Sequence, residues 1–379
     1  FLAILICSNI IGKGSKKMGN KIKKTSWKSW VLYDVGNSAF VLVVVTAIMP
    51  IFFKEFAAAH IESSQSTAYW GFANSTASLV VALLSPLLGV IADYPGKKKM
   101  LFSWFLLLGL ATTLLFVTVE KGWYIYCLTL FIIARIGWSG ANLFYDAFLP
   151  DVAEKQEMDA VSSKGYGYGY IGSVVPFLII IGLILSKGFS DGLPVFEVKV
   201  GFVVVTCWWL VFSIPLLKNV KQHYFLSSQK FKYSSLGTSL LKTAREIVTN
   251  RKILFFLIGY FFYIDGVTTV ISMATAYGRD LGFGITLLIT VLLFIQIVAF
   301  PFALLFGKLA ARFGTRKMLE TGIVIYILIT VLSFLLGWTP TMNLKATIFC
   351  IVALLVASSM GGIQALSRSY FARIIPPEK

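Results

Sequence analysis

The sequence predicts an all-α membrane protein that crosses the bilayer many times and is built from two pseudo-symmetric halves. Three observations predict this fold class: the overall hydropathy, ten apolar segments of membrane-spanning length, and a loop pattern that the chain repeats. Of the 379 residues, 57% are apolar and 13% are charged, and the mean hydropathy is +0.81. A soluble domain could not cover so much apolar surface, so lipid must be the solvent for most of the chain.

Ten segments each contain the ~20 mainly apolar residues that a transmembrane helix needs. Short polar turns separate most of them, and the exception is a longer polar segment between the sixth and the seventh. The predicted spans are residues 33–54, 70–92, 100–119, 123–148, 166–186, 198–217, 253–277, 285–306, 318–337 and 346–371.

The spans divide the chain into four regions. We expect a basic N-terminal region over 1–32, a first half of six helices over 33–217, a linker over 218–252, and a second half with four helices over 253–379. By symmetry with the first half, two further spans would complete a set of twelve. Residue 1 is Phe and a basic stretch follows Met18, so our hypothesis is that the chain is a fragment and that its first 17 residues lie outside the natural protein.

The linker carries eight basic residues and an amphipathic pattern. Its apolar residues recur at roughly helical spacing behind Ser234 and Ser235. They are Leu236, Leu240, Leu241, Ala244, Ile247 and Val248. This pattern predicts a helix that lies on the membrane surface.

Basic residues are distributed unequally between the two sides of the predicted spans. Of the 34 Lys and Arg residues, 26 fall on one side and six on the other, while Arg135 and Arg368 lie inside spans. The positive-inside rule then places the N-terminus, the repeated loops and the linker in the cytoplasm. The basic excess is therefore no sign of nucleic-acid binding. The short N-terminus favours a bacterial plasma membrane, and a vacuolar membrane is the alternative.

The reactive residue types are too sparse for redox, metal or histidine chemistry. The four cysteines are isolated in apolar runs, and His60 and His223 lie in predicted loops. The short loops hold no catalytic constellation, so we expect no enzyme, no cofactor and no metal. Residues 167–172 spell the GxGxxG dinucleotide pattern, but no strand precedes them. Gly165, Gly169 and Ser173 instead form a small-residue face that suits close helix packing.

The repeated loop joins the second and third spans of each half. One copy covers residues 89–99 and the other 307–317, and in each a glycine ends a span, a second glycine turns the chain and basic residues follow. Repeats of this kind are typical of secondary transporters, in which the binding site lies between the halves. The residues with a predicted conformational role here are Gly89, Asp93, Gly96, Lys97, Lys98, Gly307, Gly314, Arg316 and Lys317.

The repeated loop resembles the loop signature of the major facilitator superfamily, where it is thought to hold one conformation of two rocking halves. Residues 29–40, 262–267 and 364–373 resemble the vacuole-effluxer-like family of that superfamily, which includes the autophagy-related vacuolar permease and its bacterial relatives. The resemblance runs from about Trp27 to Lys379. It implies a major facilitator fold of twelve spans, a central cavity lined by spans one, four, seven and ten, and, by analogy with the fungal member, efflux of amino acids.

Polar and ionisable residues lie inside the predicted spans one, four, seven and ten. An ionisable side chain in a span costs about 2.5–3.5 kcal/mol or more, so each is a candidate functional residue. Polar stripes at helical spacing surround Arg135 in the fourth span and Asp265 in the seventh. The candidate residues of the solute or ion path are Asp34, Asn37, Arg135, Ser139, Asn142, Asp265, Thr268, Thr269 and Gln364.

Roles for the charged residues follow as hypotheses. Arg135 and Asp265 are predicted to share the midplane on opposite halves, either binding the carboxylate and the ammonium of an amino acid or forming an ion pair without a ligand. Asp146 and Arg368 lie nearer the cytoplasmic ends of their spans, and we predict that they form a latch between the halves. Asp34 is a candidate proton carrier, gate or structural cap.

Together these patterns predict a monomeric secondary active transporter in a lipid bilayer that exports a small polar solute by alternating access. Amino acids are the leading candidates for this solute. A proton is the candidate coupling ion. The alternatives are a proton-coupled sugar, drug or metabolite carrier and, in a different class, a non-transporting membrane receptor or scaffold.

Overall fold

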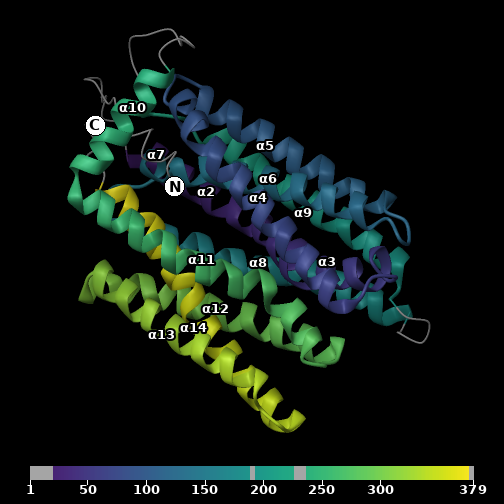
Figure 1. Cartoon of the computed structure of the whole chain (residues 1–379). Helices are drawn as coiled ribbons and strands as arrows, with labels where there is room; N and C mark the ends of the chain where they lie inside the picture. Colours follow the sequence, from purple (N-terminus) through teal and green to yellow (C-terminus); the bar gives the residue numbers. More distant parts are fainter. Residues whose placement is uncertain (1–19, 188–192, 226–235, 375–379) are drawn as a thin grey trace.

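The computed structural model describes residues 20–187, 193–225 and 236–374, and every regular element in these residues is helical (Figure 1). Ten helical segments of this part of the chain are long and apolar enough to cross a membrane, which confirms the ten predicted spans. The first span is a composite of α2 (Asn20–Phe40), η1 (Val41–Ala47), α3 (Ile48–Phe52) and η2 (Phe53–Ala57). The others are α4 (Ser63–Ala92), α5 (Lys97–Leu114) with η3 (Leu115–Thr118), α6 (Tyr124–Ala147), α8 (Met158–Lys187), α9 (Val195–Asn219), α11 (Arg251–Asp280), α12 (Ile285–Phe313), α13 (Thr315–Gly337) and α14 (Met342–Ile374).

Several helices extend beyond the predicted spans. α4 begins at Ser63 rather than at residue 70, and α8 begins at Met158 rather than at 166. These extra turns are polar, so a hydropathy pattern does not include them even though the helix continues. The hypothesis about residues 1–17 concerns residues outside the described part, and the two further spans stay a prediction.

The first span changes its helical geometry near the middle of the molecule. The β-branched run of η1 forms a π-helix, a rare helical geometry that occurs mostly as short bulges inside α-helices. Pro50 follows in α3, and it lacks the N–H that would donate to the carbonyl of Thr46. That carbonyl accepts a hydrogen bond from the hydroxyl of Thr275 in α11 instead. The proline thus frees a backbone acceptor for a contact between the halves.

Each half packs around its own central helices. In the first half α2 packs on α8 and α9, and α6 packs on α5 and α4; in the second half α14 packs on α12 and α13. The predicted small-residue face of α8 lies against α2, because a Cβ on Gly165 would lie 2.3 Å from Asp34 Oδ2 and one on Gly169 would lie 2.5 Å from Ser38 Oγ. The predicted close packing of this helix is therefore confirmed.

The two halves meet along α8 and α11. α8 packs on α12 and α14, while α11 contacts α4, η1 and α3, and Figure 1 shows α12, α13 and α14 grouped apart from α5, α6 and α9. We call the end of the bundle that carries the two repeated loops the inner end, and the opposite end, with residues 58–62 and 281–284, the outer end. The central site lies between these two ends.

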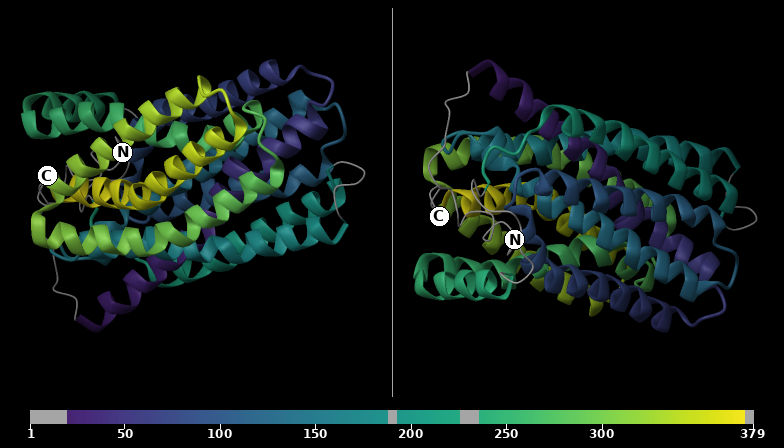
Figure 2. Two further views of the ribbon diagram at one scale, coloured as in Figure 1. Left: turned by 90° about the horizontal axis from the view of Figure 1, so that it is seen from below. Right: turned by 90° about the horizontal axis from the view of Figure 1, so that it is seen from above.

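The predicted amphipathic helix is α10 (Leu236–Thr249). It packs on α4 and α11, and both views in Figure 2 show it beside the bundle at the end where α2 begins and α14 ends. Leu241 and Val248 are 73% and 65% exposed, so its apolar face is not fully covered by the bundle. The two serines expected to precede it lie outside the described residues. Its location on a membrane surface stays a prediction.

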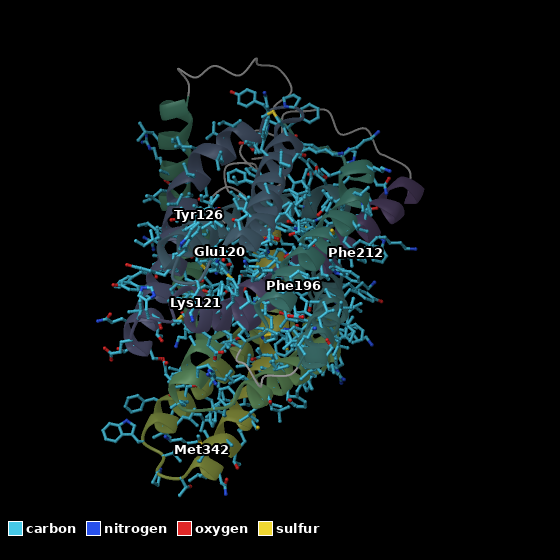
Figure 3. All side chains as sticks on the ribbon, turned by 90° about the vertical axis from the view of Figure 1, so that its right-hand side faces the viewer. Glu120, Lys121, Tyr126, Phe196, Phe212 and Met342 are labelled. Carbon is cyan, nitrogen blue, oxygen red and sulfur yellow. The ribbon has the colours of Figure 1, made fainter. Side chains whose placement is uncertain are left out.

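Apolar side chains cover much of the outside of the bundle. Phe196 of α9 and Tyr126 of α6 are exposed on the flank seen in Figure 3, and Phe255 and Phe262 of α11 are about 70% exposed. Large apolar surfaces of this kind are rare on soluble monomers and are expected on helices that face lipid.

Candidate functional site

A polar cavity lies between the two halves, and its lining reaches from the middle of α6, at Arg135, to the inner end of that helix, at Asp146. It has a volume of about 180 Å³, and its walls come from α2, η1, α6, α8, α11 and α14. Spans one, four, seven and ten therefore all contribute, as the resemblance implies, together with span five. The predicted path and latch residues that line it are Asp34, Asn37, Arg135, Asn142, Asp146, Thr268, Gln364 and Arg368. Ser139, Asp265 and Thr269 are not among its lining residues.

Arg135 brings a buried cation to the wall of this cavity. Its side chain comes from the middle of α6, is 8% exposed, and lies over the ring of Trp138 with 5.2 Å between the guanidinium carbon and the ring centroid. Its Nε has no hydrogen-bond partner and it forms no ion pair among the described residues. A buried guanidinium without a carboxylate is costly, so this side chain is suited to an anionic group of a ligand.

The structure does not bring Asp265 to Arg135. Asp265 is exposed on α11, and so is Thr269, whereas Thr268 and Ser272 of the same helix line the cavity. At about 100° per residue, Asp265 lies on the same side of α11 as Ser272, two turns further along, yet it does not line the cavity. Of the predicted stripe, Thr268 and Ser272 therefore border the cavity, and Asp265 and Thr269 do not.

Arg368 forms the densest charged cluster of the site. It lies in α14 of the second half, is 2% exposed, and pairs with two carboxylates of the first half. Its Nη1 lies 2.9 Å from Asp146 Oδ1 of α6, and its Nη2 lies 3.4 Å from Asp34 Oδ2 of α2. The predicted contact between Asp146 and Arg368 is therefore present in the structure, and Asp34 also pairs with Arg368. We call these three residues the Arg368 cluster.

Neighbouring residues hold the guanidinium of Arg368 in place. Its Nε donates to Ser162 Oγ at 2.8 Å, and its Nη2 donates to the carbonyl of Ser162 at 3.0 Å. The rings of Trp30 and Tyr166 lie at 4.5 Å from the guanidinium carbon. Planar stacking and several hydrogen bonds are how a buried arginine replaces its lost hydration.

The carboxylate of Asp34 is also fully engaged. Tyr145 donates its hydroxyl to Asp34 Oδ2 at 2.6 Å, and Asn37 donates its amide to Asp34 Oδ1 at 3.0 Å. The indole of Trp138 donates to Asn37 Oδ1 at 3.2 Å, which links the cluster to the neighbour of Arg135. Asp34 is thus a member of the contact between the halves. The roles of proton carrier and structural cap stay predictions.

A second cluster joins the halves closer to the inner end. Asp159, at the start of α8, forms an ion pair with Arg373 of α14 at 2.7 Å and accepts a hydrogen bond from Thr315 of α13 at 2.8 Å. Ser369 of α14 also donates to Asp159. None of these four was a predicted site residue, although Thr315 directly follows Gly314 in the repeated loop. We call them the Asp159 cluster.

The repeated loops turn as predicted, through glycines in the left-handed region. Gly96 has φ +74° and Gly314 has φ +91°. Gly307 lies at the closest approach of α12 to α8, since a Cβ there would lie 2.6 Å from Ser163 Oγ. These glycines therefore fix the loop geometry and the packing between the halves.

The polar residues of the loops are placed differently in the two copies. Lys98 forms a buried ion pair with Asp151 at 2.8 Å within the first half, and Asp93 is 5% exposed. Arg316 pairs with Glu320 on the exposed surface of α13. The remaining predicted loop residues are Gly89, which is buried at the end of α4, Lys97 at the start of α5, and Lys317, which is exposed on α13. A conformational role for these residues stays a prediction.

Ion pairs between the halves also lie at the outer end. Glu55 of η2 pairs with Arg279 of α11 at 2.7 Å, and Lys54 pairs with Asp280 at 2.9 Å. Thr67 of α4 donates to Asp280 as well. Contacts between the two halves therefore lie on both sides of the polar cavity, which is the arrangement an alternating-access carrier requires.

Sequence comparison decides the family. The profile of the family described as "Vacuole effluxer Atg22 like" matches residues 22–379. The chain belongs to this family. It is 43% identical over 352 residues to an uncharacterized MFS-type transporter, YxiO, of Bacillus subtilis, covering 92% of this chain and 80% of that protein. It is 24% identical over 408 residues to autophagy-related protein 22 of Eremothecium gossypii, covering 92% and 79%.

Solved structures confirm the fold class of this effluxer-like protein. The nucleoside transporter NupG superposes with a TM-score of 0.58 at 12% identity, covering 93% of this chain and 89% of that one. A bacterial homologue of ferroportin in its outward-facing state gives 0.59 at 14% identity, covering 94% and 85%. A D-xylose–proton symporter gives 0.57 at 13%, covering 92% and 87%. The chain therefore has the major facilitator fold, and its relatives are membrane transporters.

Proposed function

We propose that this transporter moves amino acids by alternating access and exports them from the cytoplasm, with its inner end on the cytoplasmic side and the monomer as the working unit. The observation that carries the proposal is the polar cavity between the halves, with the unpaired guanidinium of Arg135 on its wall. The amides of Asn37, Asn142 and Gln364 line the same cavity and offer both donors and acceptors to a small polar solute.

An amino acid needs one partner for each of its two charges. Arg135 is the candidate for the carboxylate, since a guanidinium binds a carboxylate through two parallel hydrogen bonds. Asp146 is the better candidate for the ammonium, because it lines the cavity with a side chain that is 20% exposed, whereas Asp265 does not line it. An ammonium at Asp146 would compete with Arg368 and so connect solute binding to the contact between the halves.

The transport cycle follows from which contacts must break. Opening the inner end separates Arg368 from Asp34 and Asp146 and separates Asp159 from Arg373. Opening the outer end separates Glu55 from Arg279 and Lys54 from Asp280. Because the two sets lie on opposite sides of the cavity, breaking them in turn exposes the solute to each side of the membrane.

Counterflow in proteoliposomes tests the proposed function. The purified transporter is reconstituted into vesicles preloaded with one unlabelled amino acid, and entry of the labelled form is measured at two values of pH. We expect exchange of particular amino acids that is lost in Arg135→Gln and reduced in Asp146→Asn. Asp265→Asn is the matched control for Asp146→Asn, because it neutralises an acidic residue of the spans that does not line the cavity.

Two results would contradict the proposal. Exchange that is unchanged by Arg135→Gln would refute the assignment of Arg135 as the binding site of the carboxylate. Absence of exchange for every amino acid, in a preparation that remains folded, would remove this solute class and favour the second candidate, a proton-coupled sugar or metabolite carrier. The observation behind the second candidate is the pair of carboxylates in the spans, buried Asp34 and half-buried Asp146, which a carrier can use to bind protons.

A further inference from the structure

A second, mainly apolar cavity adjoins the polar cavity, and none of the roles above uses it. It has a volume of about 100 Å³ and is lined by α11, α12 and α14 of the second half together with η1 and α8 of the first. Aliphatic side chains such as Leu292 and Val356 form most of its wall. Val41, Ile271 and Gln364 line both cavities, so the two spaces are neighbours. We call it the apolar chamber.

Three uncharged polar side chains line the apolar chamber with atoms that have no hydrogen-bond partner among the described residues. These atoms are the amide oxygen of Gln296, the phenol hydroxyl of Tyr170 and the hydroxyl of Thr46. The three residues are 8%, 8% and 5% exposed. Native proteins contain few buried polar atoms without a partner, because such atoms lose their hydration and gain no hydrogen bond. Three of them around one chamber indicate a place where a ligand supplies the missing bonds.

The lining also defines the chemistry of that ligand. No Lys, Arg, Asp or Glu side chain belongs to the wall of the chamber, so a charged group would lose its hydration there without a compensating charge. The aliphatic wall favours an apolar group. Gln296 Oε1 accepts a hydrogen bond, and the hydroxyls of Tyr170 and Thr46 can donate or accept one. The chamber therefore suits an apolar group that carries one hydroxyl or N–H.

We propose that the apolar chamber is a specificity pocket that binds the uncharged side arm of the transported solute while its carboxylate lies at Arg135. This inference rests on the proposed function for the position of the head group. Tyr170 and Gln296 are the specificity-determining residues, because their unpaired atoms distinguish an arm with a hydroxyl from the same arm without one.

The chamber also connects selectivity to the motion of the halves. Tyr170 and Thr46 belong to the first half, and Gln296 belongs to the second. A solute arm that bonds to both sides holds the halves in the geometry that forms the chamber. Solutes whose arms cannot make these bonds stabilise that geometry less, so the pocket affects the rate of exchange as well as affinity.

Competition in the counterflow assay tests the pocket with a matched pair of solutes. Tyrosine and phenylalanine differ by one hydroxyl. We expect tyrosine to compete with the labelled amino acid at a ~10-fold lower concentration than phenylalanine, because one net hydrogen bond supplies a factor of this size. In Tyr170→Phe combined with Gln296→Leu, that preference should fall to within about twofold, with phenylalanine competing as in the wild type. Tyr326→Phe is the matched control, since Tyr326 has another buried hydroxyl without a partner and lines neither cavity.

A second measurement separates the pocket from the proposed function. A cysteine introduced as Val356→Cys in a cysteine-free background reports access to the chamber through its rate of modification by N-ethylmaleimide. We expect p-cresol to protect it better than toluene at equal free concentration, and the difference to disappear in the Tyr170→Phe, Gln296→Leu variant. Protection by p-cresol without exchange of any amino acid would overturn the proposed function and leave the pocket supported. Exchange of amino acids with equal protection by both probes, or by neither, would overturn the pocket.

Discussion

Replacing Arg368 with Gln is the most direct test of how the inner end is held closed. The substitution removes the cation that Asp34 and Asp146 share and leaves two carboxylates of the first half facing a neutral amide. Their side chains are 7% and 20% exposed, so neither gains full hydration in the closed arrangement. Opening the inner end would hydrate both, and the variant should therefore favour the open state.

The size of this effect can be worked from the burial of the cluster. Removing one partner of a buried ion pair costs about 3–5 kcal/mol. The partial exposure of Asp146 and the hydrogen bonds that Asp34 keeps from Tyr145 and Asn37 place the cost near the lower end of that range. A cost of about 3 kcal/mol that acts on the closed state alone corresponds to roughly 100-fold in the ratio of open to closed molecules.

Ser163→Cys gives an assay for that population in a cysteine-free background. Ser163 is 1% exposed and lies against Gly307 of α12, between the two halves at the inner end. A membrane-impermeant maleimide added from the inner side can react with this position when the halves separate. We expect Arg368→Gln to raise the rate of modification by about 100-fold when opening and closing are fast relative to labelling.

Two controls separate opening from general disruption. Arg316→Gln removes an exposed arginine of the same half, in a pair whose side chains are 83% and 56% exposed, and it should leave the rate unchanged. Adding Asp146→Asn to Arg368→Gln removes one of the uncompensated charges and should lower the rate again. A monodisperse Arg368→Gln protein that is modified within twofold of the wild-type rate would refute the reasoning.

Three further changes follow from the site. Arg135→Gln should weaken competition by carboxylate-bearing solutes by at least ~10-fold in counterflow, whereas Arg135→Lys should retain part of it because the charge remains. Gly165→Ala should lower both exchange and the midpoint of thermal unfolding, because its Cβ would lie 2.3 Å from Asp34 Oδ2, while Gly182→Ala in the same helix meets nothing within 4 Å and should change neither. Arg373→Gln should accelerate modification of Ser163→Cys less than Arg368→Gln does, since its side chain is 26% exposed and water replaces part of the lost interaction.

The membrane architecture could be predicted because hydropathy and repetition are local properties of the sequence. Ten apolar segments and the two glycine loops are confirmed as helices and turns. The π-helical segment η1 could not be located in this way, although Pro50 and the β-branched run before it are visible. Whether such a run yields a straight helix or a bulge depends on the packing of α11 against it, which no local pattern contains.

The site could be predicted in part, for a different reason. The burial of Arg135, Asp146 and Arg368 follows from their position in apolar spans, since an ionisable group in lipid seeks the protein interior. That Asp265 does not line the cavity did not follow, because the packing of the neighbouring helices decides which turns of α11 border it. The Asp159 cluster was missed because its members lie in three separate stretches near the ends of α8, α13 and α14, where a polar residue is unremarkable in sequence.

The Arg368 cluster also shows how α6 and α14 make the contact between the two halves. Asn142 and Gln364 come from α6 of the first half and α14 of the second, as do Asp146 and Arg368. The amide pair lines the polar cavity from the two halves, and the charged pair forms the ion pair beside it. Like charges at Asp146 and Arg368 would repel across the boundary between the halves, whereas their opposite charges attract. This ion pair is therefore a contact that can hold one end of the carrier closed.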